Sequence, residues 1–155
     1  MRYDIRVAVQ PRRPIAAVAV TTTSQEYPGQ WRGMLDEVYA CLRPAGARRG
    51  CNVMLYRDLP GDDRFSAEVG VEVSDAFPAS GRVVASALPA GPAAVTTHRG
   101  PYEELGAAHL AVRRWCESQG RELTGERWEV YGDWQEDPAE LETEIFYGLV
   151  SGAPA

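Results

Sequence analysis

Short stretches of alternating hydrophobic and polar residues occur along the whole chain and predict strands with one buried face. Between Tyr3 and Val9 the odd-numbered positions are apolar or aromatic, and charged or small residues lie between them. Because successive side chains of a strand point to opposite faces, we expect this stretch to be half-buried in a sheet. Further strands are predicted at residues 15–23, 51–56, 67–73, 82–88, 93–98, 127–131 and 141–150.

Two other stretches carry apolar residues at spacings of three and four, which is the pattern of an amphipathic helix. The first helix is expected to begin near Pro28 and to end at Pro44 and Gly46, and the second to begin near Pro101 and to end at Gly120. Proline fits the first helical turn, where its missing N–H costs nothing, and glycine suits the C-terminal end. The apolar stripes are Trp31, Met34, Leu35, Val38, Tyr39 and Leu42 in the first helix, and Leu105, Ala108, His109, Val112, Trp115 and Cys116 in the second.

An internal repeat organises these elements. The order strand, proline-rich break, strand, helix, strand, acidic loop, strand occurs twice, at an offset of about 75 to 78 residues. We therefore expect a single domain over residues 1–155, built from similar halves at about 1–78 and 79–151. Antiparallel strands with one helix per half predict an α+β fold. A pseudo-twofold between the halves would put both helices on one side of the sheet and a ligand cleft along the junction.

The strand at 127–131 contains the most suggestive residue, Glu129. Strand alternation places Glu129 and Tyr131 on one face, with Trp128 on the other. A carboxylate beside an aromatic ring suggests a pocket for a cationic or easily protonated ligand, although a solvated strand residue would give the same pattern. On the repeat, Met54 takes the place of Glu129, and Tyr56 takes the place of Tyr131. A purely structural residue should more often match between halves, so the mismatch favours a functional Glu129.

Composition excludes several other classes of protein. The formal net charge of −6 argues against a nucleic-acid binder, which needs clustered Lys and Arg. The three cysteines Cys41, Cys51 and Cys116 lack CxxC spacing, so we expect reduced thiols in a cytoplasmic protein and no zinc site. Neither a signal peptide nor a membrane span is evident, and no P-loop, GxGxxG, GxSxG or HExxH motif occurs. We expect no cofactor and no metal.

Three segments carry a resemblance to a known family: residues 98–106 (HRGPYEELG), 128–131 (WEVY) and 143–145 (TEI). In these segments the sequence resembles the GyrI-like (gyrase-inhibitor-like) small-molecule-binding domain, which also forms the effector-binding half of multidrug-responsive bacterial transcription activators. The resemblance covers the second half with specific motifs and the first half through its order of elements. It implies a tandem βαββ fold with a pocket between the halves for bulky, lipophilic and often cationic compounds.

The resemblance also implies site residues. The acidic residue of the family's E-x-Y strand matches Glu129, with Tyr131 beside it, and the tyrosine at the start of the second helix matches Tyr102. In the last strand many members have a tyrosine where this chain has Phe146, so an aromatic wall is expected there without the hydroxyl. Tyr147 is a further candidate. From the residues themselves we add the ligand-binding candidates Met54, Tyr56, Trp31 and Tyr39. The last two lie on a helical stripe, where such residues are more often part of the core.

These residues leave more than one function open. We expect first a stand-alone protein that binds lipophilic, cationic or planar small molecules, as a sensor or for sequestration and protection against drugs or toxins. A buried carboxylate surrounded by aromatic rings suits such ligands, with cation–π contacts adding to the charge attraction. The same Glu129 could instead act as general base, with Tyr131 as acid, in a hydrolase that opens the strained rings of cyclopropanoid alkylating agents. A third alternative is a gyrase-inhibitor-type module that binds a protein partner. His98 could be a catalytic base, but a core or surface role is the better interpretation for His98 and His109, and Glu144 is interpreted as a structural or solvated acid.

Overall fold

The computed structural model describes residues 3–47, 49–61 and 63–151. The chain divides into two compact units. The central unit is Arg12–Leu88, and the terminal unit combines the chain up to Pro11 with the chain from Pro89 onward. Each unit holds one helix and its own antiparallel strands, and the two are described separately below.

The central unit is built from β2 (Arg13–Thr23), α1 (Trp31–Ala45), β3 (Arg49–Asp58), β4 (Arg64–Val73) and β5 (Val84–Leu88). Its strands pair antiparallel in the order β5-β2-β4-β3. The helix α1 packs against β2 and β4. Its buried residues are Met34, Val38 and Leu42, which belong to the apolar stripe that the sequence predicted.

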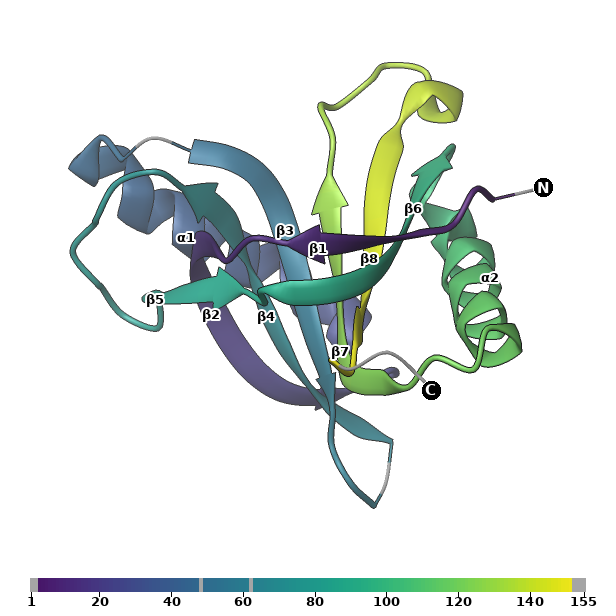
Figure 1. The fold of residues 1–155 in the computed structure, drawn as a ribbon. Helices are drawn as coiled ribbons and strands as arrows, with labels where there is room; N and C mark the ends of the chain where they lie inside the picture. The colour runs from purple at the N-terminus through teal and green to yellow at the C-terminus, as the bar shows by residue number, and fades with distance from the viewer. Residues whose placement is uncertain (1–2, 48, 62, 152–155) are drawn as a thin grey trace. The chain divides into compact units, whose positions relative to one another are not determined.

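The terminal unit is built from β1 (Arg6–Gln10), β6 (Gly91–Arg99), α2 (Leu105–Ser118), β7 (Leu123–Tyr131) and β8 (Glu142–Leu149). Its strands pair antiparallel in the order β1-β6-β8-β7, and α2 packs against β6 and β8 (Figure 1). The α+β class, the antiparallel strands and the helix in each repeat are thereby confirmed. The pseudo-twofold and the cleft between the halves remain predictions.

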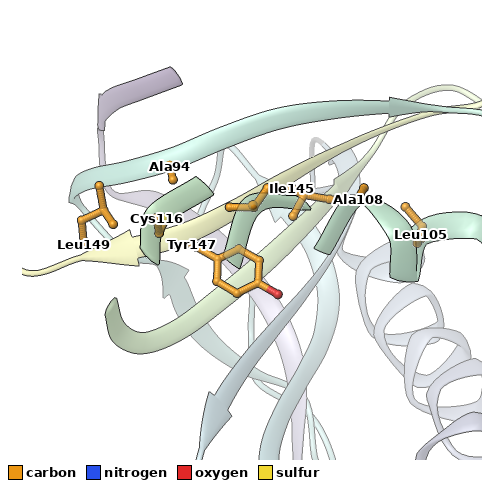
Figure 2. Close-up of a cluster of buried hydrophobic side chains, with 8 residues drawn as sticks. Ala94, Leu105, Ala108, Cys116, Ile145, Tyr147 and Leu149 are labelled. Carbon is orange, nitrogen blue, oxygen red and sulfur yellow. The ribbon is translucent and has the colours of Figure 1, made fainter. Parts of the chain in front are cut away.

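The core of the terminal unit lies between α2 and the sheet. Small side chains, Ala94 on β6 and Ala108 on α2, are fully buried there and let the helix approach the strands closely. Figure 2 shows that α2 and β8 supply most of this cluster. Its members are Ala94, Leu105, Ala108, Val112, Cys116, Ile145, Tyr147 and Leu149.

The compact units are not the two halves of the sequence repeat. β1 pairs with β6, and β5 pairs with β2, so the first strand of each half joins the second strand of the other half. The chain passes between the units at Pro11 and again at Pro89, which are the proline-rich breaks of the repeat. Proline cannot donate a ladder hydrogen bond, so it suits a point where a strand leaves its sheet. The sequence repeat alone did not indicate that the first strands of the two halves are exchanged.

Several element boundaries differ from the sequence prediction. The first helix does not begin at Pro28: Tyr27–Gly29 forms a 3-10 turn, and α1 starts at Trp31. Pro44 lies inside the last turn of α1, and the helix ends at Ala45 with Gly46 as its C-cap, whose φ of 64° favours glycine. β7 begins at Leu123, four residues before the predicted 127, because an irregularity in its pairing with β8 interrupts the alternation. Within the described residues, no helix combines the length and the hydropathy of a membrane span.

Candidate functional site

Glu129 is a buried carboxylate on the face of β7 that is turned toward α2. It is 5% exposed and pairs with Ile145 of β8, a member of the core cluster under the helix. The Tyr131 hydroxyl donates a hydrogen bond of 2.6 Å to Glu129 Oε1, so the two residues share one face as predicted. Nε2 of His109 lies 2.7 Å from the other oxygen, Oε2. Two neighbouring side chains therefore hold the carboxylate in one orientation.

His109 connects Glu129 to a second group of polar side chains. It lies on α2, and its Nδ1 atom is 2.7 Å from the Tyr147 hydroxyl of β8. Arg113, four residues further along α2, donates a hydrogen bond of 3.1 Å to the same hydroxyl. Figure 2 shows the Tyr147 ring in the core cluster, with its hydroxyl at the end away from Cys116. Residues of α2, β7 and β8 thus form one hydrogen-bonded chain from Arg113 to Glu129.

We name this group the Glu129 chain: Arg113, Tyr147, His109, Glu129 and Tyr131. The sequence did not indicate Arg113 as a site residue, and His109 was expected to have a core or surface role. Their spacing of four, which puts both on one helix face, was the available signal. That signal is weak, because only the rotation of α2 over the strands decides which residue meets Glu129.

Burial raises the pKa of two tyrosines of this region, Tyr147 and Tyr102. Desolvation raises the pKa of Tyr147 above its ordinary value, and the nearby Arg113 partly opposes this rise. Burial also raises the pKa of Tyr102. The Tyr102 ring meets the Tyr131 ring edge-to-face, with centroids 5.6 Å apart, and it is 39% exposed. Of the predicted site residues, Glu129, Tyr131, Tyr102 and Tyr147 thus gather in the terminal unit.

Phe146 lies on the opposite face of the same sheet. Strand alternation separates it from Tyr147, and its ring stacks on Trp128 at 5.4 Å with an interplanar angle of 4°. Both rings are 2% exposed. Glu144 shares this face with Phe146, and neither belongs to the Glu129 chain.

The remaining candidates lie in the central unit. Met54 and Tyr56 belong to an aromatic cluster with Tyr27 and Phe65, in which the three rings meet edge-to-face. The hydroxyls of Tyr27 and Tyr56 lie 2.9 Å and 3.1 Å from the Met54 sulfur. Tyr27 was not among the predicted residues. In the sequence it directly precedes Pro28, where the first helix was expected to begin, and nothing there marks it as a partner of Met54.

Trp31 and Tyr39 both lie on α1 and are half-buried. The guanidinium of Arg32 lies over the Trp31 ring, 5.3 Å from its centroid. The Tyr39 hydroxyl donates to Oδ1 of Asn52 at 2.5 Å, and Arg43 lies over the Tyr39 ring. These contacts fit the packing role that the sequence left open for both residues.

His98 is fully buried and has a structural role. Its Nε2 atom lies 3.1 Å from the Pro101 carbonyl oxygen, which can only accept, so this nitrogen carries the proton. Its Nδ1 atom then accepts from the Tyr3 hydroxyl at 2.9 Å. The ring thereby joins β6 to the N-terminal segment and to the turn before α2.

Two further observations concern where else a ligand or a metal ion could bind. A cavity of 320 Å³ in the central unit is lined by residues of β2, β4, β5 and the segment after β4, and it contains none of the predicted site residues. Within the described part of the chain, His, Cys, Asp and Glu form no group of three or more that could hold a metal ion.

Comparison with known proteins gives the family. The family model of the GyrI-like small molecule binding domain matches residues 3–149. A comparison with the curated proteins finds no match. Among solved structures, the C-terminal domain of EcmrR is 22% identical with a TM-score of 0.82, covering 98% of this chain and 100% of that one.

The descriptions of two other similar structures name a bound ligand or an activity. SAV2435 bound to tetraphenylphosphonium is 16% identical with a TM-score of 0.71, covering 97% of this chain and 94% of that one. A hydrolase encoded by lin2189 from Listeria innocua is 12% identical with a TM-score of 0.62, covering 94% and 91%. At these identities the structures establish the shared fold alone. The match over residues 3–149 shows that the chain belongs to the GyrI-like family of small-molecule-binding domains.

Proposed function

We propose that this domain binds lipophilic organic cations and acts as a sensor or sequestering protein, with Glu129 as the counter-ion of the bound cation. The observation that carries the proposal is the Glu129 carboxylate, which is 5% exposed and held by the hydroxyl of Tyr131 and the imidazole of His109. Fixed in this way, the carboxylate needs little reorganisation to meet a cation. Removing it from water strengthens its attraction for a positive charge.

Aromatic rings beside the carboxylate support the same ligand class. The Tyr131 ring adjoins Glu129 directly, and the Tyr102 ring extends the aromatic surface toward solvent. Faces of such rings attract cations and pack against apolar substituents, with about 0.5–2 kcal/mol per cation–π contact. The fold that this chain shares with SAV2435, which was solved with tetraphenylphosphonium bound, makes that cation the natural first probe.

The experiment is a titration of tetraphenylphosphonium into the wild-type protein and two charge-neutralised variants by isothermal titration calorimetry at pH 8. Glu129→Gln keeps the side-chain shape and should weaken binding about 10- to 100-fold, which corresponds to the loss of one charge-assisted contact. Glu144→Gln is the matched control. It removes the same charge from β8 on the opposite face and should bind like wild type. Equal affinities of wild type and Glu129→Gln would refute the proposal.

A hydrolase is the second candidate, favoured by the pairing of a buried carboxylate with an imidazole. Glu129 would take a proton from water as the water oxygen bonds to a strained ring carbon. The ring C–C bond would break, its electron pair would pass to the other carbon fragment, and the Tyr131 hydroxyl would give that fragment a proton. The Tyr131 oxygen would then regain a proton from Glu129, which it contacts. The similarity to the lin2189 hydrolase concerns the fold only. Incubation with a cyclopropane-bearing alkylating agent would then give a product heavier by one water, seen by mass spectrometry and lost in Glu129→Ala. Unchanged alkylating agent would exclude this candidate for the compound tested.

A further inference from the structure

His109 has a position in the site that the pattern of the sequence did not indicate. Its side chain is 14% exposed, and both ring nitrogens are engaged, one by Glu129 and the other by Tyr147. A histidine packed only for its volume would not need a carboxylate on one side and a hydroxyl on the other. The ring instead lies where gaining or losing a proton would change the charge next to Glu129.

The hydrogen bonds along the Glu129 chain fix the direction of each donor. Arg113 has no acceptor, so it donates to the Tyr147 oxygen. The Tyr147 hydroxyl, which burial keeps protonated, then has one hydrogen left to donate, and Nδ1 of His109 accepts it. Nε2–H of His109 in turn donates to Glu129. With a neutral His109 in this tautomer, each of these three hydrogen bonds has one donor and one acceptor.

Protonation of His109 would change this arrangement in two ways. Nδ1–H would have to donate to the Tyr147 oxygen, which already accepts from Arg113, and the Tyr147 hydroxyl hydrogen would have to turn away. At the same time an imidazolium would lie 2.7 Å from the Glu129 carboxylate as an internal ion pair. A ligand cation would then compete with a charge that belongs to the protein.

Each element packed near His109 contributes charged or titratable side chains. β7 presents Arg127 and Glu129 on the same face, β8 presents Tyr147, and α2 itself presents Arg113. The remaining titratable side chain of β7 on this face is Tyr131, which donates to Glu129. On β6 the only histidine, His98, is held by Tyr3 and by the Pro101 carbonyl. Glu129 is therefore the anion that a protonated His109 would meet in direct contact.

We propose that His109 sets the charge selectivity of the Glu129 site: as a neutral Nε2–H donor it presents an anionic carboxylate to the ligand, and as an imidazolium it replaces the cationic ligand's charge. This inference rests on the proposed function and adds to it one residue, His109, and one condition, the protonation state of that residue. Cation binding is strong where His109 is neutral and weak where it is protonated. Histidine side chains ordinarily change charge between about pH 5 and pH 8, which makes this the pH range for the test.

The test compares tetraphenylphosphonium affinity at pH 8 and pH 5 for wild type and His109→Gln. Glutamine can reproduce both hydrogen bonds of the neutral ring, donating from its amide to Glu129 and accepting from Tyr147, but it cannot take up a proton. Wild-type affinity should fall about tenfold or more between pH 8 and pH 5, while His109→Gln should lose less than about twofold. A variant that keeps the wild-type pH profile overturns the inference, because Glu129 itself would then be titrating.

A second measurement needs neither ligand nor variant. The chain has two histidines, so the ring nitrogens can be resolved by NMR on uniformly ¹⁵N-labelled wild-type protein. We expect the neutral Nε2–H tautomer of His109 at pH 8 and its conversion to the doubly protonated ring on acidification. A neutral Nδ1–H tautomer, or a ring that stays neutral at pH 5, overturns the inference.

The outcomes separate this inference from the proposed function. Wild-type protein that binds no tetraphenylphosphonium at pH 8, or that binds it equally well after Glu129→Gln, refutes the proposed function and the selectivity role together. Wild-type protein that binds through Glu129 but with a pH profile unaffected by His109→Gln refutes only the role of His109.

Discussion

Nε2 of His109 lies 2.7 Å from Oε2 of Glu129, although the two residues are 20 positions apart on a helix and a strand. The contact joins α2 to β7 at the centre of the Glu129 chain. On the other side of the carboxylate, Tyr131 comes from the same strand as Glu129. Glu129 is therefore fixed by one contact local to its strand and one contact that requires the helix to be docked.

The Tyr131 hydroxyl should contribute measurably to stability. Tyr131→Phe keeps the ring but removes the donor to the buried carboxylate, and a hydrogen bond to a charged group contributes about 1.5–3 kcal/mol. Urea unfolding at pH 7 should register a loss of free energy of this size. Tyr102→Phe is the matched control, because the Tyr102 hydroxyl makes no hydrogen bond within the described residues, and it should change stability by less than about 0.5 kcal/mol. Equal losses in the two variants would contradict the geometry of the site.

Two glycines should respond oppositely to alanine. A Cβ on Gly70 would lie 1.9 Å from the Ala16 carbonyl oxygen of the neighbouring strand, so Gly70→Ala should destabilise the protein by about 3 kcal/mol or more. A Cβ on Gly33 of α1 would meet nothing within 4 Å. Gly33→Ala should therefore stabilise the helix by up to about 1 kcal/mol. Denaturant midpoints of the two variants would measure both changes in stability. A Gly70→Ala variant as stable as wild type would contradict the close pairing of β2 and β4.

Much of the fold could be predicted from alternation and spacing, because these record which side chains a sheet or helix must bury. The shared face of Glu129 and Tyr131 followed from strand alternation alone. The exchange of β1 and β5 between the halves could not be predicted, because pairing partners are set by packing between distant segments. For the same reason the sequence could separate Tyr147 from Phe146 by parity but could not decide which of them faces α2.

The contacts of His109 with Glu129 and Tyr147 could not be predicted from the sequence for a related reason. The place of His109 in an apolar stripe indicated packing, and its ring does meet the Tyr147 ring edge-to-face, with centroids 5.6 Å apart. Only the rotation of α2 against β7 and β8 turns its nitrogens toward Glu129 and Tyr147. Met54 and Tyr56 were found as a pair, and the structure adds Tyr27, whose hydroxyl lies 2.9 Å from the Met54 sulfur.

Stability should fall on the alkaline side because tyrosines are buried in neutral form. The pKa of Tyr147 is raised above its ordinary value of 10.0, mainly by desolvation, and that of Tyr3 is raised as well. A folded-state pKa above the unfolded one stabilises the protein fully below pH 10, and this stability is lost as the pH rises through the folded value. Tyr147→Phe should be less stable at pH 7 but should decline less steeply above pH 10. Urea unfolding between pH 7 and pH 11 measures both effects, and parallel declines would contradict this assignment.

A crystal structure of the protein with tetraphenylphosphonium bound would test most directly whether Glu129 is the counter-ion of the ligand. We expect the cation on the α2-facing side of β7, with its phenyl groups against the rings of Tyr131 and Tyr102 and its charge facing the Glu129 carboxylate. A cation bound instead beside Trp128 and Phe146, or elsewhere without contact to Glu129, would contradict it.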